Sequence, residues 1–305
     1  MFNKKFLNNV FLVDSTGFVL KYWFVVPPVK TENYESIAAF LGFIGFVIRL
    51  LHDYQPKYIS FAFDESLGSC FRNKIYSDYK KTREKAPDEL KAQFKLCREF
   101  LTLMGLDNNA SKTHEADDIL YTIAKNTKQL KLNNIVLTND KDLYQLIHKD
   151  DVWWNYGDKR FTYEELIKKL NFSPQDLSDY LGLMGDSADN IPGAPGLGEK
   201  TASALMGEYK TLDNIVNNLE TIPAKIGSKY NRFIKIIEEN KKIIYLSKKL
   251  ATLDYIDDMK KNFKDLERSM IDINKIDSFF KETGMRESQK DSWIKDIQKL
   301  VVISK

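Results

Sequence analysis

The chain has 305 residues, 43% of them apolar and 29% charged, so it can bury a large core and is not a disordered protein. Its 46 basic and 43 acidic residues leave a net charge of only +3, which excludes binding of a polyanion by bulk charge alone. Cys70 and Cys97 belong to no motif and indicate reduced thiols, so we expect a cytoplasmic protein. The most apolar stretch, 39–51, is too short to cross a bilayer, and we expect no membrane contact.

Several short apolar runs are predicted to be buried strands, and three of them end in acids. Helical stretches alternate with these runs, so we expect an α/β domain with a mostly parallel sheet. Ligands of such sheets bind outside the carboxyl ends of the strands, where the acids would converge. The segment Ser15-Thr16-Gly17 after the first run is typical of a turn. The predicted strands are 9–13 ending at Asp14, 57–63 ending at Asp64, 134–138 followed by Asp140 and Asp142, and Trp153-Trp154. The predicted helices are 39–51, one that starts near Leu143, and 162–170.

The stretch His114-Glu115-Ala116-Asp117-Asp118 places three carboxylates at the start of an apolar helical run. Acids at a helix N-terminus are commonly explained by capping. Three acids repel one another, however, since Glu115 and Asp118 lie on one helix face, unless a cation lies among them. Oxygen-only clusters suit Mg²⁺ or Mn²⁺. Capping and metal binding both stay open for this stretch alone, and the acids at the strand ends favour metal.

The segment 65–106, between the second strand and the acidic helix, is too long for a plain crossover and is locally basic. Phe71, Tyr76 and Tyr79 alternate with lysines and arginines. Aromatic rings can stack on bases while the cations neutralise phosphates. A solvated pair of amphipathic helices would carry similar charges, so that alternative also stays open.

Two further acids, Asp186 and Asp189, lie directly before the glycine-rich segment 191–202. Its glycines let the backbone approach a phosphate, and a helix predicted to open at Lys200 offers free N–H groups. The Gly-x-Gly-x-Lys spacing favours helix-hairpin-helix DNA binding over a simple turn. Between Thr221 and Leu250, eight cations face two acids. This excess predicts sequence-independent binding to a duplex backbone.

Together these motifs resemble the bacterial 5′→3′ exonuclease and flap endonuclease family, which includes the N-terminal nuclease domain of DNA polymerase I. The resemblance implies a PIN-like sheet in a nuclease core over 1–180, with a helical arch at about 66–106. It also implies a helix-hairpin-helix and C-terminal helical region over 181–305. The matching segments, in family order, are LVD ending at Asp14, FAFD ending at Asp64, FRNKIYSDYKKTR over 71–83, HEADD from His114, TNDKDLYQL from Thr138 and GLMGDSADNIPGAPGLGEKTA from Gly182.

The resemblance implies that the acids hold two divalent ions, Mg²⁺ or Mn²⁺. Asp118 would lie between the two ions, as a further metal ligand, and take part in catalysis. Metal-assisted hydrolysis of a phosphodiester needs no protein nucleophile, which agrees with a chain that has only three histidines and offers no triad. The implied ligands are Asp14, Asp64, Glu115 and Asp117 for the first ion, and Asp140, Asp142, Asp186 and Asp189 for the second.

The resemblance also implies how DNA is held. Lys80 and Arg83 would reach the scissile phosphate as catalytic groups, Tyr79 would stack on a base, and the hairpin would grip the duplex, often with a bound K⁺. Lys21 stands where the family usually has an arginine, and it keeps the charge but loses the bidentate geometry. The full set of predicted DNA contacts is Lys21, Phe71, Arg72, Tyr79, Lys80, Arg83, Gly193, Gly196, Gly198, Lys200 and Thr201.

We therefore expect a structure-specific 5′ nuclease that cuts flaps and trims 5′ ends in DNA replication and repair, RNA primers included. Its expected partners are branched or 5′-flapped duplex DNA, RNA–DNA hybrids and, functionally, a DNA polymerase; we expect a monomer. Two alternatives stay open. A junction-binding protein that has lost catalysis is disfavoured because all nine acids are present. A PIN-like ribonuclease would share the acids but would not need a hairpin that grips a duplex.

Overall fold

A six-stranded sheet lies at the centre of the computed structural model, which describes residues 8–66 and 68–303. The strand order is β3-β2-β1-β4-β5-β6, and all neighbouring strands are parallel except β5 and β6. The predicted mostly parallel sheet is therefore confirmed. The strands are β1 (Asn9–Asp14), β2 (Tyr58–Asp64), β3 (Asp107–Ser111), β4 (Asn133–Leu137), β5 (Val152–Trp154) and β6 (Arg160–Thr162).

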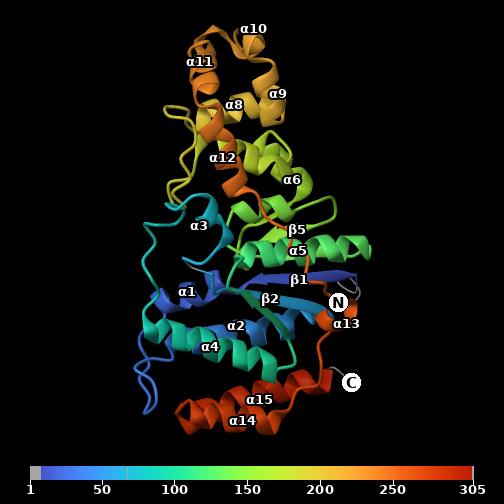
Figure 1. The fold of residues 1–305 in the computed structure, drawn as a ribbon. Coiled ribbons are helices and arrows are strands. Elements are labelled where there is room, and N and C mark those ends of the chain that lie inside the picture. The colour runs from blue at the N-terminus through green and yellow to red at the C-terminus, as the bar shows by residue number, and fades with distance from the viewer. Residues whose placement is uncertain (1–7, 67, 304–305) are drawn as a thin grey trace.

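Helices cover both faces of the sheet (Figure 1). On β1, Val10 and Leu12 face the layer of α5 (Ala116–Gln129), and the alternate residues Phe11 and Val13 face the opposite layer. That opposite layer consists of α1 (Ser15–Val25), α2 (Ala38–Tyr54) and α4 (Asp88–Leu103). Because both sides of the strand are buried, its sequence is continuously apolar rather than alternating.

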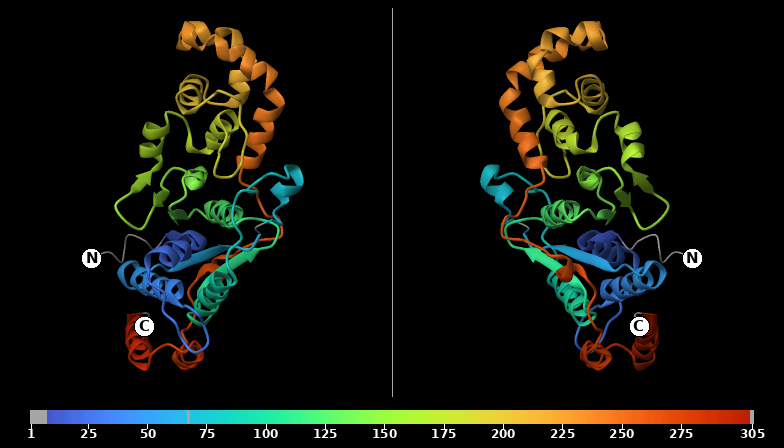
Figure 2. Two further views of the ribbon diagram at one scale, coloured as in Figure 1. Left: turned by 90° about the vertical axis from the view of Figure 1, so that its left-hand side faces the viewer. Right: turned by 90° about the vertical axis from the view of Figure 1, so that its right-hand side faces the viewer.

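A helical region extends from the α5 side of the sheet (Figures 1 and 2). Its apolar residues form one continuous cluster with those of α5 and β1, so the two parts share a core. Gly182 of α7 packs directly on α12, where an added Cβ would lie 2.9 Å from Cβ of Lys248. The helices are α6 (Tyr163–Leu170), α7 (Leu177–Met184), α8 (Glu199–Tyr209), α9 (Leu212–Asn217), α10 (Ile222–Ile226), α11 (Arg232–Glu239) and α12 (Lys241–Ala251).

After α12 the chain returns to the sheet. Residues 252–272, which we call the return segment, include the short α13 (Phe263–Leu266). The amide of Asp254 donates to the Asp118 carboxylate at 2.8 Å, and the amide of Ser269 donates to the carbonyl of Gly105 at 2.9 Å. The last two helices, α14 (Ile273–Glu282) and α15 (Glu287–Ile303), then pack below α2 and α4 (Figure 1). No described helix is long and apolar enough to cross a membrane.

The structure corrects two local predictions. Ser15-Thr16-Gly17 is not a turn but the first turn of α1, because the Asp14 side chain caps that helix by accepting from the amide of Gly17. The segment 66–106 is not one arch: α4 packs on α2, and only α3 (Phe71–Ile75) and the turns after it project from the sheet. A helix predicted from Leu143 is instead a 3₁₀ turn. The 3₁₀ turns are Asp142–Leu146, Pro174–Asp176, Leu219–Thr221 and Ser228–Tyr230.

Candidate active site

Two predicted acids lie at adjacent strand ends, as the parallel sheet requires. Asp14 ends β1, and its carboxylate accepts from the Thr138 hydroxyl at 2.8 Å as well as from the Gly17 amide at 3.3 Å. Asp64 ends β2, and its carboxylate accepts from the amide of Ala116 at 2.8 Å. That bond ties β2 to the N-terminus of α5, so the strand ends and the acidic helix are held together.

Asp117, in the first turn of α5, completes a cluster with these two acids. Burial raises the pKa of Asp117 well above its ordinary value, and the charges of Asp140, Asp14 and Asp64 raise it further. Carboxylates that raise one another's pKa in this way lie within range of one another's charge. We call Asp14, Asp64 and Asp117 the first acid group.

A second acid group consists of Asp142, Asp186 and Asp189. One oxygen from each lies within 4.8 Å of the others. Asp142 opens a 3₁₀ turn after β4, and the other two belong to a tight loop that is closed by paired backbone bonds between Asp186 and Ile191. Unlike the first group, this one is built from connections between regular elements.

Asp140 lies between the two groups. Its carboxylate accepts from the amide of Asp142 at 2.8 Å, and its own amide donates to the Thr138 hydroxyl at 2.9 Å. Thr138 therefore holds both Asp14 and Asp140, a role that sequence analysis missed although the residue is the last one of a predicted strand. Burial raises the pKa of Asp140, and the charge of Asp189 adds to the effect.

The electrostatics of both groups fit divalent cations. Burial, followed by the charges of Asp140 and Asp64, raises the pKa of Asp14 to about 7 despite the Thr138 hydrogen bond. Burial and the charges of Asp140 and Asp189 likewise raise the pKa of Asp142 to about 7. The donors are carboxylate oxygens without nitrogen or sulfur, the set that suits a hard cation. Neighbouring carboxylates of this kind are stabilised in their ionised form by bound cations.

Two predicted catalytic cations reach the site from the turns after α3. The Lys80 ammonium contacts the Glu115 carboxylate and lies 3.3 Å from Asp189, and the Arg83 guanidinium also contacts Asp189. The amide of Lys80 donates to the carbonyl of Asp189 at 2.9 Å, which docks the segment on the loop of the second acid group. Burial would lower the pKa of Lys80, but Glu115 and Asp189 raise it well above its ordinary value.

The predictions for Asp118 and Arg72 need correction. The Asp118 carboxylate is completely buried and accepts two bonds of 2.7 Å from the Arg72 guanidinium. It also accepts from the amide of Glu115, which makes the pair the capping box of α5. Arg72 is only 2% exposed and donates further to the carbonyls of Leu250 and Thr252. Asp118 therefore supports the site rather than facing it, and Arg72 is not available to DNA.

Other predicted DNA contacts differ in accessibility. Tyr79 is only 4% exposed and its hydroxyl donates to Glu115 at 2.8 Å, so in this arrangement it cannot stack on a base. Phe71 is partly exposed and packs on the ring of His114, with the ring centroids 5.2 Å apart. Lys21 lies exposed on α1, on the opposite side of the sheet from α5.

The glycine-rich segment is the loop between α7 and α8. Gly193 has a positive φ of 61° and is closed against α7, where an added Cβ would lie 2.3 Å from the amide nitrogen of Gly185. It serves packing rather than approach to a phosphate. Gly196 and Gly198 have open space around them, and the exposed Lys200 follows in the first turn of α8. Thr201 lies beside it, with its amide bonded to the carbonyl of Gly198.

Comparison with known families covers most of the chain. Residues 9–171 match the model described as 5′-3′ exonuclease, N-terminal resolvase-like domain. Residues 172–274 match the model described as 5′-3′ exonuclease, C-terminal SAM fold.

Curated relatives fall into two kinds. The 5′-3′ exonuclease of Aquifex aeolicus is 33% identical over 96% of this chain and 96% of its own length. The DNA polymerase I of Mycobacterium tuberculosis is 32% identical over 77% of this chain, but the match spans only 27% of the polymerase.

Solved structures share the fold at lower identity. The T5 D15 protein co-crystallised with metal ions is 17% identical, with a TM-score of 0.62 over 96% of this chain and 99% of that one. The catalytic core of Rad2 in complex with DNA substrate is 13% identical, with a TM-score of 0.63 over 97% of this chain and 94% of that one.

Proposed function

Because the chain belongs to the 5′-3′ exonuclease family, we propose that it is a structure-specific 5′ nuclease that hydrolyses phosphodiester bonds at the acid groups with two divalent ions. The observation that carries this proposal is the convergence of two acid groups, joined by Asp140, at the carboxyl edge of the sheet. The reaction is 5′→3′ exonucleolytic and flap-endonucleolytic cleavage.

The two acid groups divide the proposed ligands. Asp14, Asp64 and Asp117 would hold one ion, with Glu115 beside them, and Asp142, Asp186 and Asp189 would hold the other. Asp140 lies between the two groups and would bind either ion. When bound, the ions would lower the pKa of an attacking water and neutralise charge on the phosphate. Mg²⁺ or Mn²⁺ suits the oxygen donors, and we place K⁺ at the open backbone of Gly196 and Gly198.

Lys80 and Arg83 would contact the substrate phosphate. Both now form ion pairs with carboxylates of the site, which holds them at its entrance. A phosphodiester that enters would compete for the same cations, so these side chains would exchange carboxylate oxygens for phosphate oxygens. Positioned cations of this kind stabilise charge that develops in the transition state, typically by about 3 to 4 kcal/mol each.

The helical region would hold the duplex. The exposed tip of the glycine loop and the lysines of α11 and α12 offer backbone amides and positive charge without base-specific contacts. Some of the similar solved structures contain DNA. The T5 D15 flap endonuclease was solved as a pseudo-enzyme-product complex with DNA and metal ions, and the catalytic core of Rad2 was solved in complex with a DNA substrate. We propose that the substrates of this protein are 5′-flapped DNA and RNA–DNA hybrids. We further propose that it acts as a cytoplasmic monomer in functional partnership with a DNA polymerase.

The test is cleavage of an end-labelled 5′-flap duplex with Mg²⁺, beside EDTA and an Asp140→Asn variant, with DNA binding followed separately by fluorescence anisotropy. We expect cutting near the flap junction that EDTA and the variant abolish, while binding persists. Tight flap binding without cutting in Mg²⁺ or Mn²⁺ would instead identify a junction-binding protein. Preferential cutting of single-stranded RNA would identify a ribonuclease.

A further inference from the structure

Asn190 follows directly after the last acid of the second acid group, and its side chain reaches out of that loop. The side-chain amide donates at 2.7 Å to the backbone carbonyl of Asp78, which comes 112 residues earlier in the chain. Asp78 belongs to the turns after α3, residues 76–83, which we call the cation turn because they carry Lys80 and Arg83. Asn190 therefore joins the loop of the second acid group to the segment that carries both cations.

Three consecutive residues of the cation turn are each held by a hydrogen bond from outside the turn. Asn190 binds the carbonyl of Asp78, the side-chain amide of Asn73 binds the carbonyl of Tyr79 at 2.8 Å, and the carbonyl of Asp189 accepts from the amide of Lys80 at 2.9 Å. Lys80 adopts a positive φ of 52°, a conformation that costs free energy in a residue with a Cβ and persists only where its surroundings hold it. The place of the Lys80 ammonium is thus set by contacts to the backbone of the turn.

The bond from Asn190 joins neutral groups, unlike the ion pairs of the cation turn. Lys80 and Arg83 both contact the Asp189 carboxylate. A divalent ion would take that carboxylate, and both cations would then turn to a phosphate. The amide of Asn190 and the carbonyl of Asp78 compete with neither exchange. Their bond therefore can keep the cation turn docked while the charged groups change partners.

Asn190 also shapes its own loop through its backbone. Its φ is 59°, in the left-handed region, and it directly precedes Ile191, which pairs with Asp186 to close the loop. Glycine adopts this conformation without steric cost, so Asn190→Gly removes the side-chain amide and keeps the backbone. Asn171, at the C-cap of α6 with a φ of 66°, accepts the same substitution elsewhere and provides a matched control.

We propose that Asn190 is a positioning residue for cleavage. Its side chain holds the cation turn on the loop of the second acid group, so that Lys80 faces the same phosphate as an ion held by that group. Asn190 itself contacts neither the ion nor the phosphate. This role rests on the proposed function, since it belongs to the same reaction. A chain that keeps every acid and both cations but lacks this amide should bind flap DNA and ions normally and yet cut slowly.

The first experiment is single-turnover cleavage of the 5′-flap duplex in Mg²⁺. We expect Asn190→Gly to slow cleavage about tenfold, because a catalytic cation is displaced from the phosphate. Flap affinity, measured by fluorescence anisotropy, and the half-activating concentration of Mn²⁺ should change less than about twofold. Asn171→Gly should match the wild type. Recovery of the Asn190 variant to the wild-type rate in excess Mn²⁺ would reveal a defect of ion binding in the loop and would overturn the proposal.

Coupling to Lys80 separates positioning from a general loss of structure. In a Lys80→Met background, the cation that Asn190 positions is already absent. Asn190→Gly should therefore slow cleavage further by no more than about threefold in that background. A purely structural role would give about the same tenfold loss in both backgrounds, and that result would also overturn the proposal.

Limited trypsin digestion in the absence of DNA tests the contact without any cleavage of substrate. Lys81 and Arg83 are exposed trypsin sites in the cation turn. We expect Asn190→Gly to speed digestion there about fivefold, because the turn opens more easily when one hydrogen bond is lost. Unchanged digestion of the turn would overturn the proposal.

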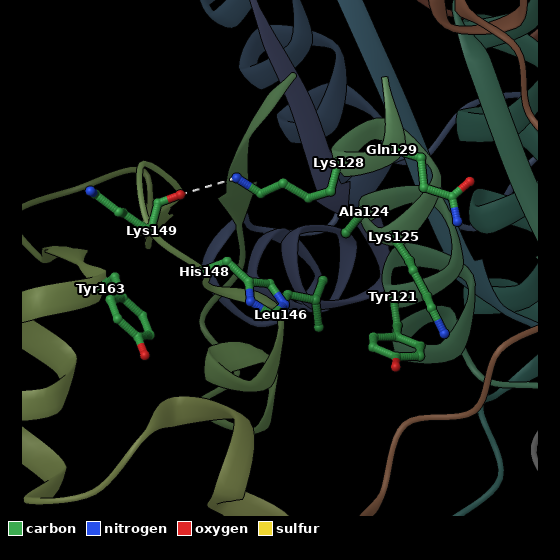
Figure 3. Close-up of a pocket in the computed structure, with 9 residues that line it drawn as sticks. All are labelled: Tyr121, Ala124, Lys125, Lys128, Gln129, Leu146, His148, Lys149 and Tyr163. Atoms are coloured by element: carbon green, nitrogen blue, oxygen red, sulfur yellow. Dashed lines mark hydrogen bonds between the residues drawn. The ribbon is translucent and has the colours of Figure 1, made fainter. Parts of the chain in front are cut away.

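Lys149 provides an internal reference for the digestion. It is exposed just before β5 begins, whereas Asp14 and Asp64 lie where parallel strands end. It lines a cavity of about 780 Å³, and Figure 3 shows it across that cavity from Lys125 of α5. Digestion after Lys149 should be the same in Asn190→Gly as in the wild type, and a general rise at both places would identify global destabilisation and overturn the proposal.

Failure of this role can be told from failure of the proposed function. A wild type that cuts no flap refutes the nuclease and the positioning role with it. A wild type that cuts, beside an Asn190→Gly variant that cuts equally fast, leaves the nuclease intact and overturns only the role of Asn190.

Discussion

The two acid groups achieve similar charge density by different means. Asp14, Asp64 and Asp117 project from two central strands and one helix that share a buried core. The second group consists of Asp142 in a 3₁₀ turn and two acids in the loop before α8. Side chains on regular elements are positioned more precisely than side chains on loops. The first group is therefore fixed by the sheet, whereas the second depends on how the helical region docks.

The first prediction compares the groups by removing one carboxylate from each. We expect Asp14→Asn to slow flap cleavage about 10³-fold or more, since a rigid site cannot replace a lost ligand. We expect Asp186→Asn to slow it about 10- to 100-fold, because a loop can rearrange around an ion. Single-turnover cleavage with increasing Mn²⁺ is the measurement, and only the Asp186 variant should recover. Equal losses without recovery in either variant would remove the distinction between the groups.

The second prediction contrasts two cations near Glu115. Lys80→Met should slow cleavage about 10²-fold and leave stability nearly unchanged, because Glu115 keeps Arg72 and Tyr79 as partners. Arg72→Met should lower the free energy of unfolding by about 3–5 kcal/mol, because it leaves buried Asp118 without its ion pair.

Urea unfolding measures the stability of each variant, and single-turnover cleavage measures its activity. Lys91→Met is the control, since its ion pair with Asp88 is exposed and should contribute little to stability. A Lys80 variant that lost stability as Arg72→Met does would show that Lys80 is structural.

The third and smallest effect concerns pH. Asp14 and Asp142 have folded-state pKa values of about 7, above the ordinary value of 3.8, so the folded state binds more protons than the unfolded state. Without metal, stability should therefore fall as pH rises from about 4 to about 7. At pH 8, Asp14→Asn and Asp142→Asn should each melt higher than the wild type in EDTA.

Mg²⁺ should reverse that order, because only the wild type keeps a complete set of ligands. Thermal melts at several pH values, with EDTA and with Mg²⁺, measure both effects. The variant that flattens the pH dependence more identifies the group with the stronger repulsion. A wild-type stability that rises between pH 4 and pH 7 in EDTA would contradict the prediction.

The central sheet was predictable because its buried strands are short apolar runs that end in acids. β3 was missed because Asp107–Ser111 reads DNNAS, and a polar strand at a sheet edge has no apolar pattern. The approach of Asp14 and Asp64 followed from parallel topology alone. The capping role of Asp118 had a local signal, since an acid three residues after Glu115 is the spacing of a capping box.

The burial of Arg72 had no local signal. Its guanidinium binds the carbonyl of Leu250, which is 178 residues away in the chain, so no pattern around Arg72 reveals the contact. Tyr79 was similarly misjudged as free to stack, because its partner Glu115 comes from a different segment. Site residues on strand ends were thus predictable from sequence, whereas those in the projecting turns depended on packing between distant segments.

The return segment also governs when the site is completed during synthesis. Asp254 donates to Asp118 although it comes 136 residues later in the chain, and Arg72 reaches the carbonyls of Leu250 and Thr252 at the same place. At about 5–20 residues per second, a ribosome needs roughly 7 to 27 seconds to add those residues. Throughout that interval the nascent chain lacks the Asp254 amide that binds Asp118 and the carbonyls that hold Arg72, so the centre cannot mature in step with the sheet that carries it.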